Sequence, residues 1–162
     1  MLRRLILLRH AKSAWNTDHV DHARPLNGRG RRDAPRMGAL LTERGYVPDL
    51  VVSSDAQRTQ ETWEGLQESL PGIPVRWNPL LYLGGGQAIG DTIANQPSEI
   101  RCLLLIGHNP GFSAMASWLS GEDIELKTAT AAVMEIDADE WADAMGQGDW
   151  NLIEVFRPPQ DD

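Results

Sequence analysis

Three short apolar runs limit this chain to a fold built around a buried sheet. Residues 5–8, 50–52 and 103–106 consist only of Leu, Ile and Val. Runs of three or four such residues, bounded by polar or turn residues, are typical of strands that are buried on both faces. Further strands are predicted at residues 75–77, 131–136 and 152–156.

Helical patterns lie between the predicted strands. The first helix is predicted to begin at Asp33, which would act as its N-cap, and to end at Gly45. A second helix is predicted to follow a cap formed by residues 53–55, because its apolar residues recur at intervals of three and four. Residues 84–86 are three glycines, which predict a flexible loop. Two shorter helices are expected at residues 89–93 and 112–119.

The alternation of strands and helices favours an α/β fold with a largely parallel sheet. We therefore expect a three-layer sandwich in which helices cover both faces of the central sheet. The chain has 162 residues, of which 41% are hydrophobic, and it contains no internal repeat and no linker. A chain of this length and composition predicts one domain that spans residues 1–162.

The charged residues are unevenly distributed. The net charge of −8 argues against a nucleic-acid-binding protein, which would need a basic face. Residues 1–58 nevertheless hold 11 of the 15 Lys and Arg residues and only 6 of the 23 Asp and Glu residues. This asymmetry has two interpretations: ordinary charge scattered over a surface, or a site for an anion built by the first third of the chain.

Several features bear on the location and cofactors of the protein. No apolar run approaches the roughly 20 residues of a membrane span, and the N-terminus lacks the pattern of a signal peptide. Cys102 is the single cysteine, which rules out an intramolecular disulfide and suggests a reducing compartment. We therefore expect a cytoplasmic protein and a monomer. With four histidines and one cysteine, we expect no metal and no other cofactor.

Polar groups follow three of the predicted strands immediately. Arg9 and His10 follow the first strand, Arg58 lies one helical turn beyond the second, and His108 follows the strand at 102–106. A single arginine or histidine in such a place is usually a surface or structural residue. Ligands of open α/β sheets, however, bind at the carboxyl ends of strands, where helix N-termini also favour anions. Together, the four residues predict a phosphate site.

Three segments of the chain carry a resemblance to a known family. Residues 8–16 read LRHAKSAWN, residues 53–62 read SSDAQRTQET and residues 106–111 read IGHNPG. In this order they resemble the sequence blocks of the histidine phosphatase superfamily, which is also called phosphoglycerate-mutase-like. The short length and the segment 24–30, RPLNGRG, look most like its compact bacterial SixA-like branch. One departure is Ala11, where the family usually has glycine.

The resemblance implies roles for individual residues. His10 would be the nucleophile that becomes phosphorylated, whereas Arg9, Arg58 and His108 would bind oxygens of the transferring phosphoryl group. Planar guanidinium groups suit this task because each can contact two oxygens. Further contacts to the substrate or its phosphate would come from Asn16, Ser13 and Asn109.

The general acid is the residue that the resemblance does not supply. Larger family members place a glutamate after the third strand, but residues 79–86 contain no carboxylate. An alkoxide leaving group needs a proton, whereas the labile P–N bond of phosphohistidine needs less help. Asp18, Asp21 and His22 could supply a proton from the loop after the nucleophile, or they could simply be solvated loop residues.

These observations leave three hypotheses for the function. The resemblance favours a metal-independent phosphatase that dephosphorylates phosphohistidine on a signalling or phosphocarrier protein. The alternatives are a phosphomonoesterase for a small phosphorylated metabolite and a module that binds a phosphorylated partner without turnover. Only 49 residues separate Arg58 from His108, which leaves little chain for a lid and favours a protein substrate. Nucleic acids and membranes are not expected as partners.

Overall fold

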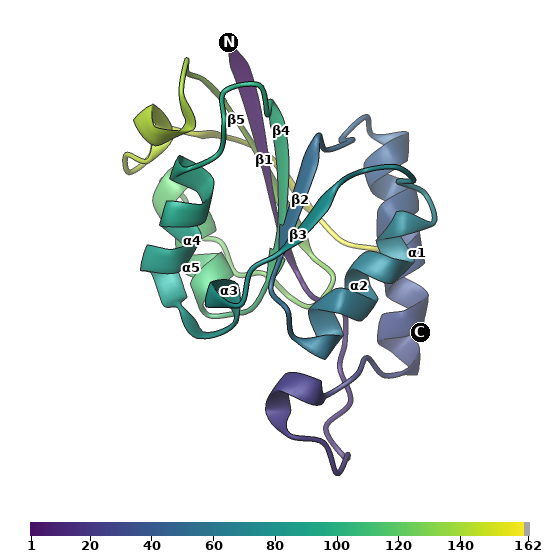
Figure 1. Cartoon of the computed structure of the whole chain (residues 1–162). Helices are drawn as coiled ribbons and strands as arrows, with labels where there is room; N and C mark the ends of the chain where they lie inside the picture. The colour runs from purple at the N-terminus through teal and green to yellow at the C-terminus, as the bar shows by residue number, and fades with distance from the viewer. Residues whose placement is uncertain (161–162) are drawn as a thin grey trace.

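The computed structural model describes residues 1–160 and contains a six-stranded sheet between two layers of helices (Figure 1). The strand order across the sheet is β3-β2-β4-β1-β5-β6. The strands are β1 (Leu2–Arg9), β2 (Leu50–Ser53), β3 (Val75–Trp77), β4 (Cys102–Gly107), β5 (Ala131–Asp137) and β6 (Asn151–Phe156). The four strands from β3 to β1 run parallel, and β5 and β6 are antiparallel to their neighbours. The predicted α/β fold with a largely parallel sheet is confirmed.

The helices divide between the two faces of the sheet (Figure 1). One layer contains α1 (Gly28–Glu43) and α2 (Gln57–Gln67). The other contains α3 (Leu80–Leu83), α4 (Gly85–Ala94) and α5 (Gly111–Ser120). The predicted three-layer sandwich is therefore confirmed. Among residues 1–160, no helix has the length and apolar character needed to cross a membrane.

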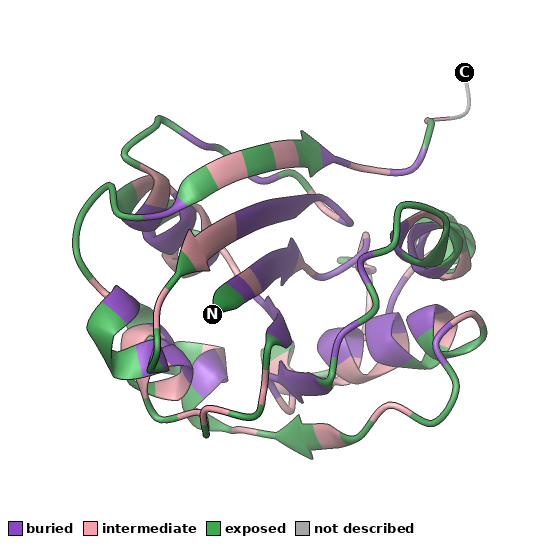
Figure 2. Cartoon of the chain, turned by 90° about the horizontal axis from the view of Figure 1, so that it is seen from above, coloured by how far each residue is buried: buried purple, intermediate pink, exposed green. Residues whose placement is uncertain are grey.

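Each central strand contributes to two hydrophobic cores. In β1, Leu5 and Leu7 pack with the layer of α4 and α5, whereas Ile6 and Leu8 pack with the layer of α1 and α2. This division follows from the alternation of side chains along a strand. Figure 2 shows the buried residues concentrated in the central strands and on the helix surfaces that face them. The runs of consecutive apolar residues thus reflect burial on both faces.

The first helix begins earlier than its pattern predicted. Asn27 is the N-cap of α1, and its side-chain oxygen accepts a hydrogen bond from the Gly30 N–H at 2.9 Å. Asp33, the predicted cap, lies inside the helix and is buried. The prediction was wrong because proline is common only in the first turn of a helix, which favours a start near Pro35, whereas α1 accommodates this proline in its interior.

Two further local predictions were wrong. Ala56 is the N-cap of α2, and no side chain caps this helix, although the Ser54 hydroxyl accepts a hydrogen bond from the Ala56 N–H. Residues 84–86 are not a flexible loop, because Gly84 ends α3 and Gly85 begins α4 at a φ of 63°. Glycine reaches this left-handed conformation without strain, so it allows the sharp turn between the two helices.

Candidate active site

A pocket of about 210 Å³ lies at the carboxyl ends of the parallel strands. Arg9 and His10 reach it from the end of β1, Arg58 from the first turn of α2, and His108 from the residue after β4. The structure thus brings together the four residues that the sequence predicted to form one site. We call this cavity the strand-end pocket; it is lined by Arg9, His10, Lys12, Ser13, Trp15, Asp21, Arg24, Arg58, His108, Asn109 and Thr128.

His10 is held as a neutral imidazole with one nitrogen free. Its side chain is nearly buried, and Nδ1 lies 2.7 Å from the Ala11 carbonyl oxygen. A carbonyl can only accept, so Nδ1 carries the proton and Nε2 keeps its lone pair. The pKa of His10 is lowered to about 3, mainly by burial and also by His108, Arg58 and Arg9, although the bond to the Ala11 carbonyl acts in the opposite direction. The ring is therefore uncharged at neutral pH and can act as a nucleophile through Nε2.

The backbone on both sides of His10 is fixed by hydrogen bonds. The His10 N–H donates to the Gly107 carbonyl oxygen of β4, and the Ala11 N–H donates to the Thr62 hydroxyl of α2. The Ala129 N–H lies within hydrogen-bonding distance of the carbonyl oxygens of both Arg9 and His10. The Ala11 side chain is fully buried in the core, so this turn accommodates an alanine where the family usually has glycine.

His108 is oriented by the serine at the end of β2. Its Nε2 lies 2.8 Å from the Ser54 hydroxyl oxygen, and the two histidine rings lie 5.2 Å apart. The Ser54 hydroxyl accepts from the Ala56 N–H and can also donate its own proton to Nε2. With that bond, Nδ1 of His108 carries the ring proton. This buried atom has no hydrogen-bond partner within residues 1–160. Burial lowers the pKa of His108 to about 4, so the ring can donate a hydrogen bond without being charged.

The two arginines keep donors unused. Arg58 is largely buried; its Nη1 donates to the Asp21 carbonyl oxygen at 2.8 Å and its Nη2 to the Asp21 carboxylate at 3.2 Å. Arg9 donates from Nη1 to the Leu126 carbonyl oxygen, and burial lowers its pKa. The buried Nε atoms of both arginines lack a partner within the described chain. Unpaired cationic donors around a small pocket favour an anion.

Asp21 also lines the pocket, as an ionised group. The Tyr82 hydroxyl donates a hydrogen bond to its carboxylate, and Arg24 and Arg58 form ion pairs with it. The bond from Tyr82, followed by the effects of these two arginines, lowers the pKa of Asp21 to about 2. A carboxyl group with this pKa carries no proton to donate at neutral pH.

The other predicted site residues lie in different surroundings. Ser13 lines the pocket, and its hydroxyl accepts a hydrogen bond from Arg24 at 2.9 Å. Asn109 also lines it, but its amide bonds to the Leu126 carbonyl oxygen and to Ser113. These contacts give both residues a bracing role. Asn16 and Asp18 are exposed and lie outside the residues that line the pocket. The structure thus does not bring them to the site.

Several residues that shape the site leave no clear signal of their contacts in the sequence. Arg24 and Lys12 add positive charge to the pocket, and the Trp15 ring covers the Arg24 guanidinium at 3.7 Å. Tyr82 lies on α3, within residues 79–86, where larger family members carry a glutamate. Its contact with Asp21 joins positions 61 residues apart, which no local pattern could show.

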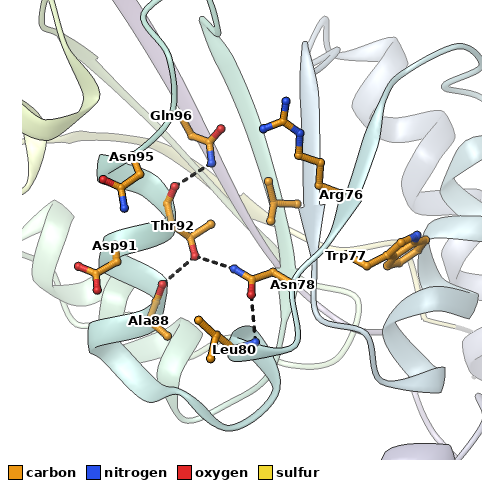
Figure 3. A pocket seen from close by; sticks show the side chains of 10 residues that line it. Arg76, Trp77, Asn78, Leu80, Ala88, Asp91, Thr92, Asn95 and Gln96 are labelled. Carbon is orange, nitrogen blue, oxygen red and sulfur yellow. Dashed lines mark hydrogen bonds between the residues drawn. The ribbon is translucent and has the colours of Figure 1, made fainter.

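Metal ions and a second cavity are further possible ligand features of residues 1–160. Within residues 1–160, no three His, Cys, Asp or Glu side chains form a group that could hold a metal ion. A separate cavity of about 420 Å³ lies between β3 and α4 at the edge of the sheet (Figure 3). Its amides bond largely to their surroundings, since Asn78 donates to the Thr92 hydroxyl and Gln96 to the Thr92 carbonyl oxygen.

Comparison with known proteins assigns the family. The family model described as histidine phosphatase superfamily (branch 1) matches residues 5–82. A chloroplastic protein of Arabidopsis thaliana is 36% identical over 96% of this chain and 78% of its own length. A solved structure assigned as the phosphohistidine phosphatase SixA of Nakamurella multipartitia is 30% identical, with a TM-score of 0.85 over 98% of this chain and 97% of its own. The chain belongs to the histidine phosphatase superfamily.

A second solved structure supports the same branch of this superfamily. The protein assigned as SixA from Agrobacterium tumefaciens is 30% identical, with a TM-score of 0.84 over 96% of this chain and 98% of its own. This histidine phosphatase is therefore SixA-like and is a phosphatase by function. Its strand-end pocket lies where the family's sequence blocks meet, with residues 5–82 supplying Arg9, His10 and Arg58.

Proposed function

We propose that this phosphatase hydrolyses phosphohistidine on a protein, with His10 as the nucleophile. The observation that carries the proposal is the protonation state of the strand-end pocket. His10 is neutral, and Asp21, the carboxylate among the lining residues, is ionised. Such a pocket offers a nucleophile and positive charge but no ready acid. The proposal is supported further by the two SixA-like structures, which are assigned as phosphohistidine phosphatases.

The first step transfers the phosphoryl group to the enzyme. Nε2 of His10 attacks the phosphorus, and the P–N bond to the substrate imidazole breaks. The departing nitrogen takes a proton from water. His10 keeps its proton on Nδ1, bonded to the Ala11 carbonyl, so the phosphorylated ring carries a positive charge. A covalent intermediate of this kind divides one difficult displacement into two easier ones.

The second step releases phosphate. Water attacks the phosphorus, loses one proton to solvent, and the bond between phosphorus and Nε2 breaks. His10 leaves as the neutral tautomer with which it began. In both steps Arg9, Arg58 and the Nδ1–H of His108 would stabilise the equatorial oxygens, and such fixed donors supply most of the rate in phosphoryl transfer. We propose that these charges make a resident metal unnecessary.

The choice of substrate follows from the missing acid. The leaving group of an alkyl phosphate ester is an alkoxide, which needs a proton in the transition state. Asp21 is ionised, and the pKa of Tyr82 is raised by burial and by its bond to Asp21, so neither group is suited to donate one. The P–N bond of phosphohistidine is labile, and its imidazole can take a proton from solvent. The pocket therefore favours N-phosphoryl substrates over esters.

The decisive experiment measures phosphate release from a protein that carries phosphohistidine, beside para-nitrophenyl phosphate and a sugar phosphate. We expect the wild type to prefer phosphohistidine and His10→Ala to lose at least 10³-fold in kcat/KM. His19→Ala is the matched control, because His19 is exposed and does not line the pocket. Activity in the presence of a chelator tests independence from metals.

Other outcomes would replace the proposal. Faster turnover of the sugar phosphate than of phosphohistidine would show that an acid operates in the pocket and that the substrate is a metabolite. Para-nitrophenyl phosphate, whose phenolate leaves without a proton, reports only that phosphoryl transfer occurs. Tight binding of the phosphoprotein with no release of phosphate would point to a recognition module instead. A radiolabelled phosphoryl group that stays on the enzyme in alkali and is lost in acid would identify the His10 intermediate. The absence of such a label during steady turnover would contradict the proposed mechanism.

A further inference from the structure

A groove of about 430 Å³ adjoins the strand-end pocket. Its walls come from α3, the start of α4, residues 108–111 and the first turn of α5. We call it the α3–α4 groove. The volume lies within the range of about 300–1,000 Å³ that is usual for ligand sites. Residues 108–111 belong to one of the family's sequence blocks, but the proposed chemistry gives no role to the part of the groove formed by α3, α4 and Ala114.

The groove and the pocket share part of their lining. His108 and Asn109 line both cavities, so a molecule whose phosphoryl group occupied the strand-end pocket could extend directly into the groove. The part of the substrate that lies next to phosphorus and opposite the nucleophile is the leaving group. Because His108 lines both cavities, the α3–α4 groove is a candidate site for that group.

The two cavities differ sharply in charge. The strand-end pocket is lined by Lys12, three arginines and Asp21. The residues that line the groove include no Lys, Arg, Asp or Glu, and its apolar wall is formed by Leu81, Leu83, Ile89, Pro110 and Ala114. An anionic leaving group would lose its hydration there without gaining a charged partner. The groove therefore favours a neutral and largely apolar leaving group.

A row of rings connects the pocket to the groove. The centroids of His10 and His108 lie 5.2 Å apart, those of His108 and Tyr82 5.6 Å, and those of Tyr82 and His22 4.8 Å. The last two pairs meet edge to face, which is a favoured arrangement of aromatic rings. A flat ring on the leaving group would find aromatic partners beside it. A sugar ring would find few hydrogen-bonding groups.

We propose that the α3–α4 groove binds the leaving group and selects the histidine side chain of the phosphorylated protein together with apolar residues beside it. This inference rests on the proposed function. The groove is open to solvent at Leu83, whose surface is 83% exposed, so a side chain presented on the surface of another protein can reach it. The occupant is thus the phosphohistidine segment of a protein, rather than a free anionic or sugar metabolite.

The test fills the groove from one wall and then from the other. A Cβ placed on Gly86 meets no atom within 4 Å, and Ala114 is exposed on α5, so Gly86→Leu and Ala114→Leu can be made without disturbing the core. The substrates are a phosphohistidine peptide and phosphoramidate, whose leaving group is only ammonia. We expect each variant to lower the ratio of kcat/KM for the peptide to kcat/KM for phosphoramidate about tenfold.

Two controls distinguish an effect of filling the groove from an effect of substitutions elsewhere on the surface. Gln87→Leu makes a similar change at an exposed position of α4 that does not line the groove. Arg76→Ala alters the separate cavity at the sheet edge (Figure 3). Both should keep the wild-type ratio, and thermal unfolding should confirm that all four variants are folded.

The outcomes distinguish this inference from the proposed function. If the wild type hydrolyses both compounds but folded Gly86→Leu and Ala114→Leu keep the wild-type ratio, the groove does not bind the leaving group, while the proposed function stands. The same conclusion follows if the controls lower the ratio as much as the groove variants. If the wild type hydrolyses neither N-phosphoryl compound, the proposed function fails and the inference fails with it.

Discussion

The strand-end pocket and the α3–α4 groove lie side by side but are built differently. The pocket is charged, and the ends of parallel strands position its key residues Arg9, His10 and His108. The groove lacks charged side chains, and short helices joined at Gly84 and Gly85 form much of its wall. A phosphoryl group is the same in every substrate, whereas the leaving group differs. The contrast suggests that the rigid sheet provides the chemistry and that the helical segment determines the choice of substrate.

The largest expected effect comes from removing a cation of the strand-end pocket. Arg58→Ala should lower kcat/KM about 10³-fold for the phosphohistidine peptide and for phosphoramidate alike, since Arg58 is proposed to bind the phosphoryl group that both share. Steady-state kinetics with the two substrates measures this effect. Arg58→Lys keeps the charge but loses the planar guanidinium group, so its kcat/KM should lie between those of Arg58→Ala and the wild type.

An effect of Arg58→Ala on only one of the two substrates would contradict the division of roles between the strand-end pocket and the α3–α4 groove. If Arg58→Ala impaired the peptide far more than phosphoramidate, Arg58 would be binding the leaving group rather than the phosphoryl oxygens. Because Arg58 is buried and bonds to Asp21, the free energy of unfolding must be measured for each variant. Arg76→Ala, an exposed arginine on β3, provides the control for loss of a positive charge.

The pocket should also make the protein sensitive to acid. The pKa of His10 is about 3 in the folded protein and about 6.5 in the unfolded chain, so the unfolded state binds more protons between these values. The stability that depends on neutral His10 is complete above pH 6.5 and is lost as the pH falls towards 3. At pH 5 this loss amounts to about 2 kcal/mol, at about 1.4 kcal/mol for each pH unit.

Denaturant unfolding between pH 7.5 and pH 4.5 measures this loss. His10→Gln cannot titrate and should retain more of its stability at low pH, whereas His19→Gln, at an exposed histidine, should follow the wild type. A saturating concentration of inorganic phosphate should raise the pKa of His10 and reduce the loss of stability in acid, because an anion in the pocket favours the protonated ring. Equal acid sensitivity in His10→Gln and the wild type would mean that His10 is not the group responsible.

The sequence predicted the two regions unequally. The gathering of Arg9, His10, Arg58 and His108 could be foreseen because the carboxyl ends of parallel strands meet at one edge of a sheet. The strand pattern and the end of α1 just before the left-handed Gly45 were equally clear, since buried strands and a left-handed glycine leave local signals. Each of these features is marked by residues that are close in the sequence, at the end of one strand or one helix.

The remaining features depend on contacts between distant segments. The triple glycine at 84–86 predicts flexibility when it is considered alone, yet it forms the junction of two helices that pack on the sheet. The path of the loop after β1 decides that Asp21 reaches the pocket while Asn16 and Asp18 do not. No local preference encodes that path. The groove could not be predicted for the same reason, because its walls come from three separate helices.

The smallest expected effect concerns the residue that joins the two regions. Tyr82 lines the groove, and its hydroxyl donates to Asp21, which holds Arg58 in the pocket. Tyr82→Phe keeps the ring and removes this one hydrogen bond, a loss of about 1 kcal/mol. It should lower kcat/KM about fivefold for both substrates and leave their ratio unchanged, because only the positioning of Arg58 is affected.

Tyr82→Leu removes the ring as well, and comparison of the two variants separates the two contributions. Loss of the aromatic contact, worth about 1 kcal/mol, should lower kcat/KM for the phosphohistidine peptide by a further fivefold and leave phosphoramidate at the level of Tyr82→Phe. Tyr82 would then serve the pocket through its hydroxyl and the groove through its ring. A drop in the ratio that is already complete in Tyr82→Phe would instead assign the selection of substrate to the hydroxyl, and the separation between a charged pocket and an apolar groove would have to be abandoned.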